Sequence, residues 1–456
     1  MNPAVLFTLL SLLFGSVTIA LAPPLRGPDE GAHFVRAYAI ALGEIIPRRT
    51  DAHGRRGTFL PAGIHDDLAF FEEARQRERG NYRAVMGDHA GWRADRPALD
   101  RGAVPVFVLY GGSEGYSPIP YLPHVVAAWA AKLAGLDFLP TLYLMRFSGL
   151  LAATAVTAYA ISRTPHLRWA FLLIAMLPSS LYGRSVISAD GAVLSCTLVV
   201  LALCLGAAAQ RTGRALPRSI WMTLCILTKP SQIAMVLLEA MVRPLRDLRR
   251  QWRAAALVVL PGLILTPLWV VSVGGEMAAW RLYEGTDVAP QEFNALWKLK
   301  FMLENPLHFP AALVTSLDFS AELWRQMIGV LGWLDTRLQS WTYPIVSALL
   351  IVAGLERLPL DAATRVRVAA VAGITALAYC LLVFLIFYLT STPAEADRVR
   401  GVQGRYFVVA LPLLAIVLAA LLPRAPRRGW TTGAALSGAA LSGLAVCEAI
   451  LRTDWP

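Results

Sequence analysis

The chain is a series of long apolar segments separated by polar loops. Most of these segments approach the ~20 residues that a helix needs to cross a bilayer. Inside lipid a segment must satisfy its own backbone hydrogen bonds, so we expect each span to be a helix. The segments fall at 4–23, 120–138, 140–162, 168–183, 190–209, 219–242, 254–274, 339–355, 367–391, 405–423 and 429–451. This pattern predicts an all-α polytopic membrane protein with about 10–12 membrane segments, in one transmembrane domain over residues 1–456.

Two of the segments allow more than one interpretation. Residues 120–138 are short and carry Pro123, His124 and Lys132, so they are either a span or a helix lying in the membrane interface. Residues 219–242 are interrupted by Thr228-Lys229-Pro230-Ser231 and have basic loops on both sides. We expect this second segment to dip into the membrane and return as a hairpin, with Lys229 at its tip.

Arginines in the short loops set the expected topology. The net charge is +11, but the large loop 24–118 is nearly balanced in acids and bases. The excess lies at Arg163, Arg168, Arg211, Arg214, Arg218, Arg243, Arg246, Arg249, Arg250, Arg253, Arg365, Arg367, Arg424, Arg427 and Arg428. Basic loops face the cytoplasm, so the loops 24–118, 184–189, 275–338 and 392–404 are predicted to lie outside. The basic charge therefore reports topology, and we expect no nucleic-acid partner.

The two largest of these outer loops are 24–118, for which we expect amphipathic helices, and 275–338. The composition, 56% hydrophobic and 16% charged, agrees with a membrane protein. The five cysteines all fall in apolar stretches, so we expect buried free thiols. Ala20-Leu21-Ala22 resembles a cleavage site, but no Lys or Arg precedes the first apolar segment, which favours an uncleaved first helix.

The first candidate site follows the first apolar segment. If residues 30–42 are helical, Asp29, His33 and Arg36 share one face, at spacings of four and three. Asp29 could simply cap this helix. Alternatively, Asp29 with Glu30 could act as a general base, or these carboxylates with His33 could hold a divalent metal ion. The pattern does not choose among these roles and leaves the role of His33 open.

Three further groups carry candidate chemistry. Gln403-Gly404-Arg405-Tyr406 stands at the outer mouth of segment 405–423, where Arg405 could bind phosphate in a bidentate manner or lie at the membrane interface. Lys229, in its proline-broken apolar setting, is a second candidate for phosphate, with a snorkelling lysine as the alternative. Trp333 and Asp335 could form a sugar-stacking face, although Trp is also common at membrane interfaces. Asp190, which opens another segment, is typical of a helix cap.

The chain has no Walker A loop, no dinucleotide fingerprint and no His-Glu-x-x-His zinc motif. Nothing in the sequence indicates a nucleotide bound in the cytoplasm. A reaction on the outer face would therefore need a substrate that arrives already activated.

The motifs together resemble a family. Pro28-Asp29-Glu30, His33-Phe34, Arg36-Ala37-Tyr38 and Gly43-Glu44 resemble the opening motif of a large bacterial family of polytopic membrane proteins known only as a domain of unknown function. Its later motifs are similar, in the same order, to Ser188-x-Asp190, Leu227-Thr228-Lys229-Pro230, Gly332-Trp333-Leu334-Asp335-Thr336 and Gln403-Gly404-Arg405-Tyr406. The resemblance covers nearly the whole chain.

That family is in turn similar to the GT-C glycosyltransferases, which carry an acidic motif in the first outer loop. The resemblance implies a GT-C-like helical bundle in the bacterial inner membrane, with its active face outside. It implies transfer of a sugar from a polyprenyl-phosphate donor to a glycan or lipid acceptor in cell-envelope polysaccharide synthesis. Asp29 then matches the catalytic base with Glu30 beside it, and Arg405 and Lys229 are candidates for the lipid phosphate. His33 has no fixed counterpart, because several GT-C enzymes use a single acid and no histidine.

Two other classes remain open from the sequence. A transporter or flippase for polyprenyl-linked saccharides would need polar residues near the bilayer midplane and commonly has repeated halves. The spans here are largely uncharged and no repeat is evident, which favours an enzyme. A non-catalytic assembly component of a polysaccharide machine is the third class.

Overall fold

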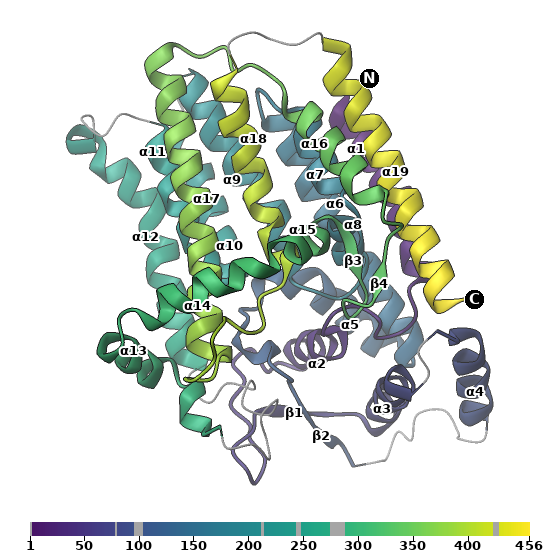
Figure 1. Cartoon of the computed structure of the whole chain (residues 1–456). Helices are drawn as coiled ribbons and strands as arrows, with labels where there is room; N and C mark the ends of the chain where they lie inside the picture. Colours follow the sequence, from purple (N-terminus) through teal and green to yellow (C-terminus); the bar gives the residue numbers. More distant parts are fainter. Residues whose placement is uncertain are drawn as a thin grey trace.

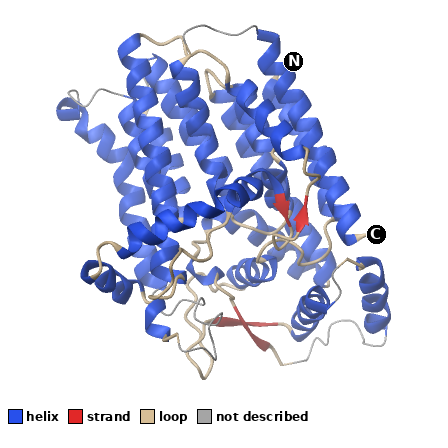
Figure 2. Ribbon diagram, in the orientation of Figure 1, coloured by secondary structure: helices blue, strands red, loops and turns tan. Residues whose placement is uncertain are grey.

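A computed structural model describes residues 2–77, 80–94, 104–210, 214–242, 248–273, 288–422 and 428–456. The chain forms a bundle of helices, and two further segments pack at one end of it (Figures 1 and 2). We call the described parts of residues 22–121 and residues 288–337 the first and second outer segments, after the loops that were predicted to lie outside. Among the described residues, seven helices are long and apolar enough to cross a membrane. They are α1 (Pro3–Leu21), α6 (Phe138–Arg163), α9 (Asp190–Gln210), α12 (Leu248–Val273), α17 (Ala362–Ser391), the run of η8 (Gly404–Val409) with α18 (Ala410–Leu421), and α19 (Arg428–Asp454). The polytopic helical prediction is confirmed at this level.

One expected span is divided into two short helices. The segment predicted at 168–183 consists of α7 (Arg168–Met176) and α8 (Pro178–Ser185). Pro178 has no N–H to donate and its ring clashes with the preceding turn, so α7 ends at Met176 and Leu177 has an extended ψ of 145°. Pro178 then occupies the first position of α8, which proline tolerates. The prediction of one continuous segment here was wrong.

The hairpin predicted at 219–242 is confirmed. Helix α10 (Ala215–Thr228) ends just before Lys229, and η3 (Pro230–Leu238) and α11 (Glu239–Val242) return along it. The two open ends of the hairpin are joined by a salt bridge of 2.7 Å between Arg218 and Glu239.

The second ambiguous segment contains a short helix. Helix α5 (Leu122–Ala134) has 13 residues, about 20 Å at 1.5 Å per residue, against a hydrocarbon core of about 30 Å. It therefore does not cross a membrane, and it packs beside α2 and α6 at the end of the bundle that carries the outer segments (Figure 1). A third short apolar helix, α16 (Thr342–Gly354), packs against α19 within the bundle.

The first outer segment is built from helices and a small β-ladder. It contains α2 (Glu30–Ala41), β1 (Gly57–Leu60), α3 (Ala62–Arg77), α4 (Tyr82–Ala94), β2 (Val106–Leu109), η1 (Ser113–Gly115) and η2 (Ile119–Tyr121). Strands β1 and β2 pair antiparallel, with Gly57 opposite Leu109. A hydrophobic cluster that includes Phe34, Phe71 and Phe138 packs this segment onto α6.

The second outer segment is described from residue 288 and also ends in a small ladder. It contains η6 (Pro290–Phe293), α13 (Ala295–Glu304), α14 (His308–Ser316), η7 (Leu317–Phe319), α15 (Ser320–Gly329), β3 (Val330–Leu331) and β4 (Thr336–Arg337). Strands β3 and β4 pair antiparallel. The chain is mostly helical, as predicted, and each outer segment adds one short two-stranded ladder.

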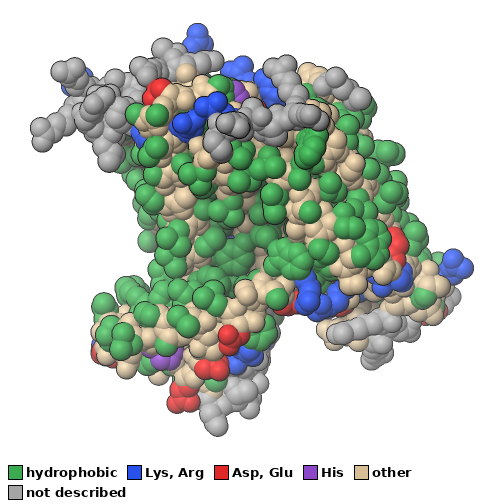
Figure 3. All heavy atoms as spheres, turned by 45° about the horizontal axis from the view of Figure 1, so that its top comes forward, with side chains coloured by type: hydrophobic (Ala, Val, Ile, Leu, Met, Phe, Trp, Pro, Cys, Tyr) green, Lys and Arg blue, Asp and Glu red, His purple; other side chains and the backbone are tan. Residues whose placement is uncertain are grey.

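The basic loops and the outer segments lie at opposite ends of the bundle (Figure 1). Lys and Arg side chains are visible along the end at the top of Figure 3. The predicted cytoplasmic residues Arg211, Arg243, Arg246, Arg424 and Arg427 lie outside the described residues, as do parts of the loops predicted at 24–118 and 275–338. The side chains of Arg249, Arg250 and Arg428 are likewise not described.

The five cysteines are free thiols, as predicted. Cys196, Cys204 and Cys225 are buried, whereas Cys380 and Cys447 are half-buried. The expectation of complete burial therefore holds for three of the five.

Candidate functional site

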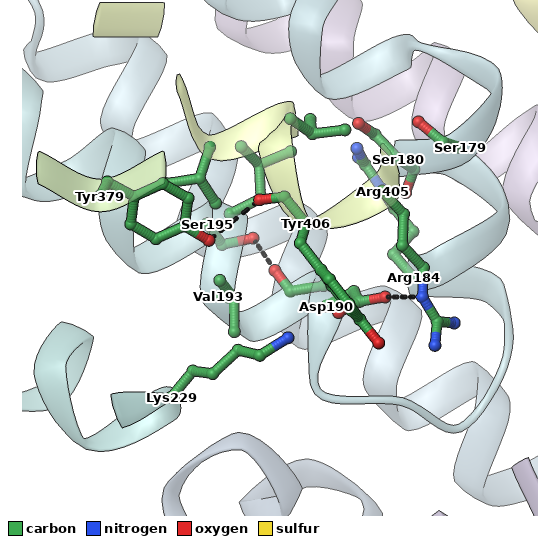
Figure 4. Close-up of a pocket in the computed structure, with 14 residues that line it drawn as sticks. Ser179, Ser180, Arg184, Asp190, Val193, Ser195, Lys229, Tyr379, Arg405 and Tyr406 are labelled. Atoms are coloured by element: carbon green, nitrogen blue, oxygen red, sulfur yellow. Dashed lines mark hydrogen bonds and ion pairs between the residues drawn. The ribbon is translucent and has the colours of Figure 1, made fainter. Parts of the chain in front are cut away.

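Charged side chains from four distant segments meet where the outer segments join the bundle. Asp29 precedes α2, Asp190 begins α9, Lys229 stands at the tip of the hairpin, and Arg405 and Tyr406 lie in η8. We call these five residues the Arg405 cluster. Figure 4 shows Asp190, Lys229, Arg405 and Tyr406 projecting into one region.

Asp29 does not act as the helix cap that its position suggested. Its backbone is left-handed, with φ 55° and ψ 22°, and its side chain makes no capping hydrogen bond. The carboxylate instead accepts a hydrogen bond from Arg405, with 3.2 Å between Oδ2 and the guanidinium nitrogen. A non-glycine residue in this conformation costs about 1–3 kcal/mol, although Asp tolerates it better than most. The side chain remains 47% exposed, so a second molecule can reach it.

Asp190 does not cap its helix either. The Ser188 hydroxyl accepts the Asp190 backbone N–H at 3.2 Å, which supplies the cap at the start of α9. The Asp190 carboxylate lies 3.7 Å from the Arg405 Nε. Arg405 is thus placed between two carboxylates.

Lys229 reaches the cluster because α10 stops one residue before it. Its backbone is extended, with φ −160° and ψ 138°, and Pro230 disfavours a helical conformation at the preceding residue. The Lys229 ammonium lies 3.7 Å from the centroid of the Tyr406 ring, a cation–π contact.

Arg405 retains unused hydrogen-bonding capacity. Its side chain is 13% exposed, yet its Nε is buried and makes no hydrogen bond. A buried donor without an acceptor is costly. The cluster can therefore accept an anionic or oxygen-bearing group beside Arg405.

Three side chains of the second outer segment hold the loop that leads to Arg405. Backbone N–H groups of Ala394, Val399 and Gly404 donate to Glu292, Ser316 and Gln326, at 2.6, 2.9 and 2.8 Å. On the other side, the Tyr379 hydroxyl donates to the Tyr406 carbonyl at 2.9 Å. The position of Arg405 is therefore fixed from both the outer segment and the bundle.

His33 lies beside the cluster and is uncharged at ordinary pH. Its Nδ1 shares a hydrogen bond of 2.6 Å with the Tyr121 hydroxyl, and its ring packs edge-on to Tyr116. Burial lowers the pKa of the imidazole to about 4, although the carboxylates of Asp29 and Asp190 favour its protonation. His33 therefore contributes a neutral polar surface and no charge.

A cavity of about 30 Å³ opens within the cluster. It is lined by Asp190, Lys229, Arg405 and Tyr406, with Arg184 and Tyr379 deeper in the bundle. This volume holds about two water molecules. A phosphate or sugar is larger than this volume, so it would have to bind outside the cavity, where the Asp29 carboxylate is exposed, or displace the lining side chains.

Glu30 lies outside the cluster and is fully buried. Both of its carboxylate oxygens bind Arg146 at 2.7 Å, and they also accept the backbone N–H groups of Gly27 and Ile187. These contacts join the first outer segment to α6 and to the loop before α9. We assign Glu30 a structural role.

Arg36 is also fully buried and bound to backbone carbonyls. It donates to Glu44 and Ile45, at 3.1 and 2.7 Å. It closes the end of α2 and does not reach the Arg405 cluster, so the shared face predicted for Asp29, His33 and Arg36 does not converge on one site.

Trp333 and Asp335 take part in a second network. Arg26 binds Asp335 at 2.8 Å and Asp454 at 3.0 Å. The Trp333 ring lies beneath the Arg75 guanidinium, 3.9 Å from ring centroid to Cζ. These contacts join the two outer segments to the end of α19.

Gln403 directly precedes η8, and its Oε1 is buried without a hydrogen-bond partner. Among the described residues, no group of three or more His, Cys, Asp and Glu side chains is arranged to hold a metal ion. In particular Asp29, Glu30 and His33 do not converge, because Glu30 points to Arg146.

Sequence reasoning missed Asp190 and Tyr379 as parts of the site. Asp190 was visible as the third residue of Ser188-Ala189-Asp190, but its position at the start of an apolar segment favoured a cap. Tyr379 lies inside the run 367–391 and carries no signal of its own.

One comparison with known proteins gives a match. The model of a family described as predicted membrane protein (DUF2142) matches residues 12–417, most of the chain. No curated protein and no solved structure gives a match.

Proposed function

We propose that in this chain, which belongs to the predicted membrane protein family DUF2142, the Arg405 cluster is the active site of a glycosyltransferase. The enzyme moves a sugar from a polyprenyl-phosphate donor to a hydroxyl of a glycan or lipid acceptor. One observation carries the proposal: an exposed carboxylate, Asp29, lies 3.2 Å from a mostly buried guanidinium, Arg405, that shares a cavity with Lys229. A base and two cations at one point suit attack by a hydroxyl on a phosphate-linked sugar.

Three of the charged groups have a direct role in this reaction. Asp29 takes the proton from the acceptor hydroxyl as its oxygen bonds to the anomeric carbon. The bond between that carbon and the phosphate oxygen breaks, and the electron pair leaves with the phosphate. Arg405 and Lys229 stabilise the charge of the departing phosphate. Direct displacement inverts the anomeric centre, by analogy with inverting glycosidases.

Because Asp29 is paired with Arg405, the availability of Asp29 as a base depends on whether the sugar donor is bound. The hydrogen bond from Arg405 occupies one oxygen of the Asp29 carboxylate. When the donor phosphate binds Arg405, it competes with Asp29 for the guanidinium. Asp29 is then free to take the acceptor proton only when the donor is bound.

Asp29→Asn tests the base. We expect purified protein with a radiolabelled polyprenyl-phosphate sugar and an acceptor extract to lose turnover by about 100-fold or more, the usual effect of removing a general base. The matched control is Asp397→Asn, an exposed carboxylate on the 392–404 loop. Equal turnover in Asp29→Asn and the unchanged protein would remove Asp29 from the reaction.

Arg405→Lys tests the phosphate-binding role. It keeps the charge but loses the planar fork of donors, so we expect a raised donor KM. Arg400→Lys, an exposed arginine on the same loop, is the control. Movement of the intact donor across the membrane without sugar release would contradict the enzyme and favour a transporter.

A further inference from the structure

Helix α13 exposes leucines and buries a lysine, the opposite of what is expected for a helix that packs on a protein in water. Leu296 and Leu303 are 78% and 73% exposed, whereas Lys298 is fully buried. A water-facing helix buries its leucines and exposes its lysines. Lys298 finds no hydrogen-bond acceptor and lies over the rings of Phe301 and Tyr388, at 5.1 and 4.9 Å. The medium around the outer face of α13 must therefore tolerate leucine better than water does.

The exposed apolar stripe continues onto α14. Leu307 and Val314 are 79% and 66% exposed, and Leu317 is also exposed. Pro310 and Ala311 lie between them on the same face, at spacings of three and four. This stripe contains no charged side chain over two and a half turns, which is a large apolar surface for a loop in water.

Helices α13 and α14 pack on the end of a membrane-spanning helix. Ala312 joins a buried cluster with Phe384 and Tyr388 of α17, and His308 Nδ1 bonds the Tyr388 hydroxyl at 2.8 Å. Helix α17 ends at Ser391, so these contacts fall within its last two turns, about 10 Å along its axis. The pair α13–α14 therefore packs against the last two turns of a candidate span, at the end of that span nearest the outer segments.

Charged residues on α13 occupy a neighbouring stripe. Lys300 and Glu304 are exposed and form an i, i+4 pair at 3.8 Å. One side of the helix thus suits lipid and the adjacent side suits water, as in helices that lie in the membrane interface. In Figure 3 the lobe at the lower left, where Figure 1 has α13 and α14, presents hydrophobic side chains toward the hydrophobic flank of the bundle.

We propose that α13 and α14 lie in the membrane interface, with Leu296, Leu303, Leu307 and Val314 in contact with the acyl chains of membrane lipids. The second outer segment is then partly embedded and is not a loop in free solution. The apolar stripe is continuous with the lipid-facing surface of the spans through α17, and acyl chains are its occupant. This inference does not depend on the transfer reaction.

The interfacial position has a consequence for the Arg405 cluster. Ser316 at the end of α14 holds Val399, and Gln326 of α15 holds Gly404 beside Arg405. Through the Ser316 contact the helix pair, together with α15 through the Gln326 contact, sets the height of Arg405 relative to the lipid surface. A guanidinium held at this height is suited to a phosphate that projects from the bilayer.

Nitroxide labelling tests the proposal. Leu303→Cys, Leu307→Cys and Lys300→Cys are labelled one at a time, in a Cys380→Ala, Cys447→Ala background, and reconstituted in vesicles of phosphatidylethanolamine and phosphatidylglycerol. Leu377→Cys, exposed in the middle of α17, is the lipid reference, and Arg400→Cys is the water reference. Accessibility of each label to oxygen and to a water-soluble nickel chelate is measured by paramagnetic resonance.

We expect the labels at 303 and 307 to resemble the lipid reference, with oxygen favoured over the nickel chelate. The label at 300, on the same helix as 303, should resemble the water reference. Nickel accessibility at 303 and 307 equal to that at 300 would overturn the proposal, because the stripe would then face water. Labels at 303 and 307 that are shielded from both reagents would also overturn it, in favour of a second copy of the chain covering the stripe.

Discussion

Asp29 and Glu30 are neighbours in the chain, but they face opposite environments. Asp29 is 47% exposed and shares one hydrogen bond with Arg405. Glu30 has no exposed surface, and its two oxygens accept four hydrogen bonds. An exposed carboxylate can exchange protons with a substrate, whereas a buried one with every oxygen occupied holds structure.

The two carboxylates should therefore respond differently to removal of their charge. Glu30→Gln leaves the Arg146 guanidinium buried without a counter-charge, which costs about 3–5 kcal/mol. We expect a clear fall in melting temperature for the detergent-solubilised protein. Asp29→Asn serves as the matched comparison, and its melting temperature should stay close to that of the unchanged protein. Equal melting temperatures for Glu30→Gln and Asp29→Asn would contradict the structural role of Glu30.

Candidate site residues could be identified from the sequence, but those with a role in the site could not be told apart from those with a structural role. Asp29, Lys229 and Arg405 stand out as polar residues at the ends of apolar segments, and the structure brings these three together. The role of Glu30 depended on Arg146, which is 116 positions away and lies inside an apolar run. Pairing over that distance has no local signal, so the acid pair looked like a single unit.

Among the elements, η8 depends on the absence of a side chain at Gly404. A Cβ at this position would lie 1.9 Å from the Leu323 carbonyl oxygen and 2.7 Å from the Gln326 Cβ. The close approach allows the Gly404 N–H to reach the Gln326 side chain. Glycine is therefore needed for packing between α15 and η8, and this packing places the next residue, Arg405.

Gly404→Ala should displace Arg405 without unfolding the bundle. A shift of about 1 Å in a positioning group can reduce turnover by about 100-fold. We expect this loss in the sugar-transfer assay, with an unchanged elution profile in gel filtration. Gly433→Ala in α19 is the control, because a Cβ there meets nothing within 4 Å. Full turnover in Gly404→Ala would show that α15 does not position Arg405.

The helices could be predicted from the sequence where the apolar runs were long. Helices α1, α6, α9, α17 and α19 match the predicted runs to within a few residues. The two ladders were missed because strands of two to four residues carry too little alternation, and β1 pairs with a strand about 50 positions later. The apolar stripe of α13 and α14 was also hidden, since each helix is shorter than a span.

In the molecule as a whole, the residues of the Arg405 cluster lie at one end of the bundle and the basic loops lie at the other. Segments beginning at residues 22, 186, 229 and 392 all turn at the same end of the bundle, so Asp29, Asp190, Lys229 and Arg405 meet there. At the opposite end, Glu356 accepts the Leu167 N–H at 2.9 Å, which joins two of the loops that carry basic residues. A site at one end suits chemistry on one membrane face better than passage through the membrane.

This division predicts which end faces the cytoplasm. Basic loops are retained on the cytoplasmic side, so Arg357, exposed in the loop after α16, should lie inside, and Arg400, exposed in the loop before η8, should lie outside. Arg357→Cys and Arg400→Cys are expressed in a bacterial host and treated with a membrane-impermeant maleimide. We expect Arg400→Cys to be labelled in intact cells and Arg357→Cys only after permeabilisation, with the unsubstituted protein as the background. The reverse pattern would put the cluster on the cytoplasmic face, where a donor displayed on the outer surface could not reach it.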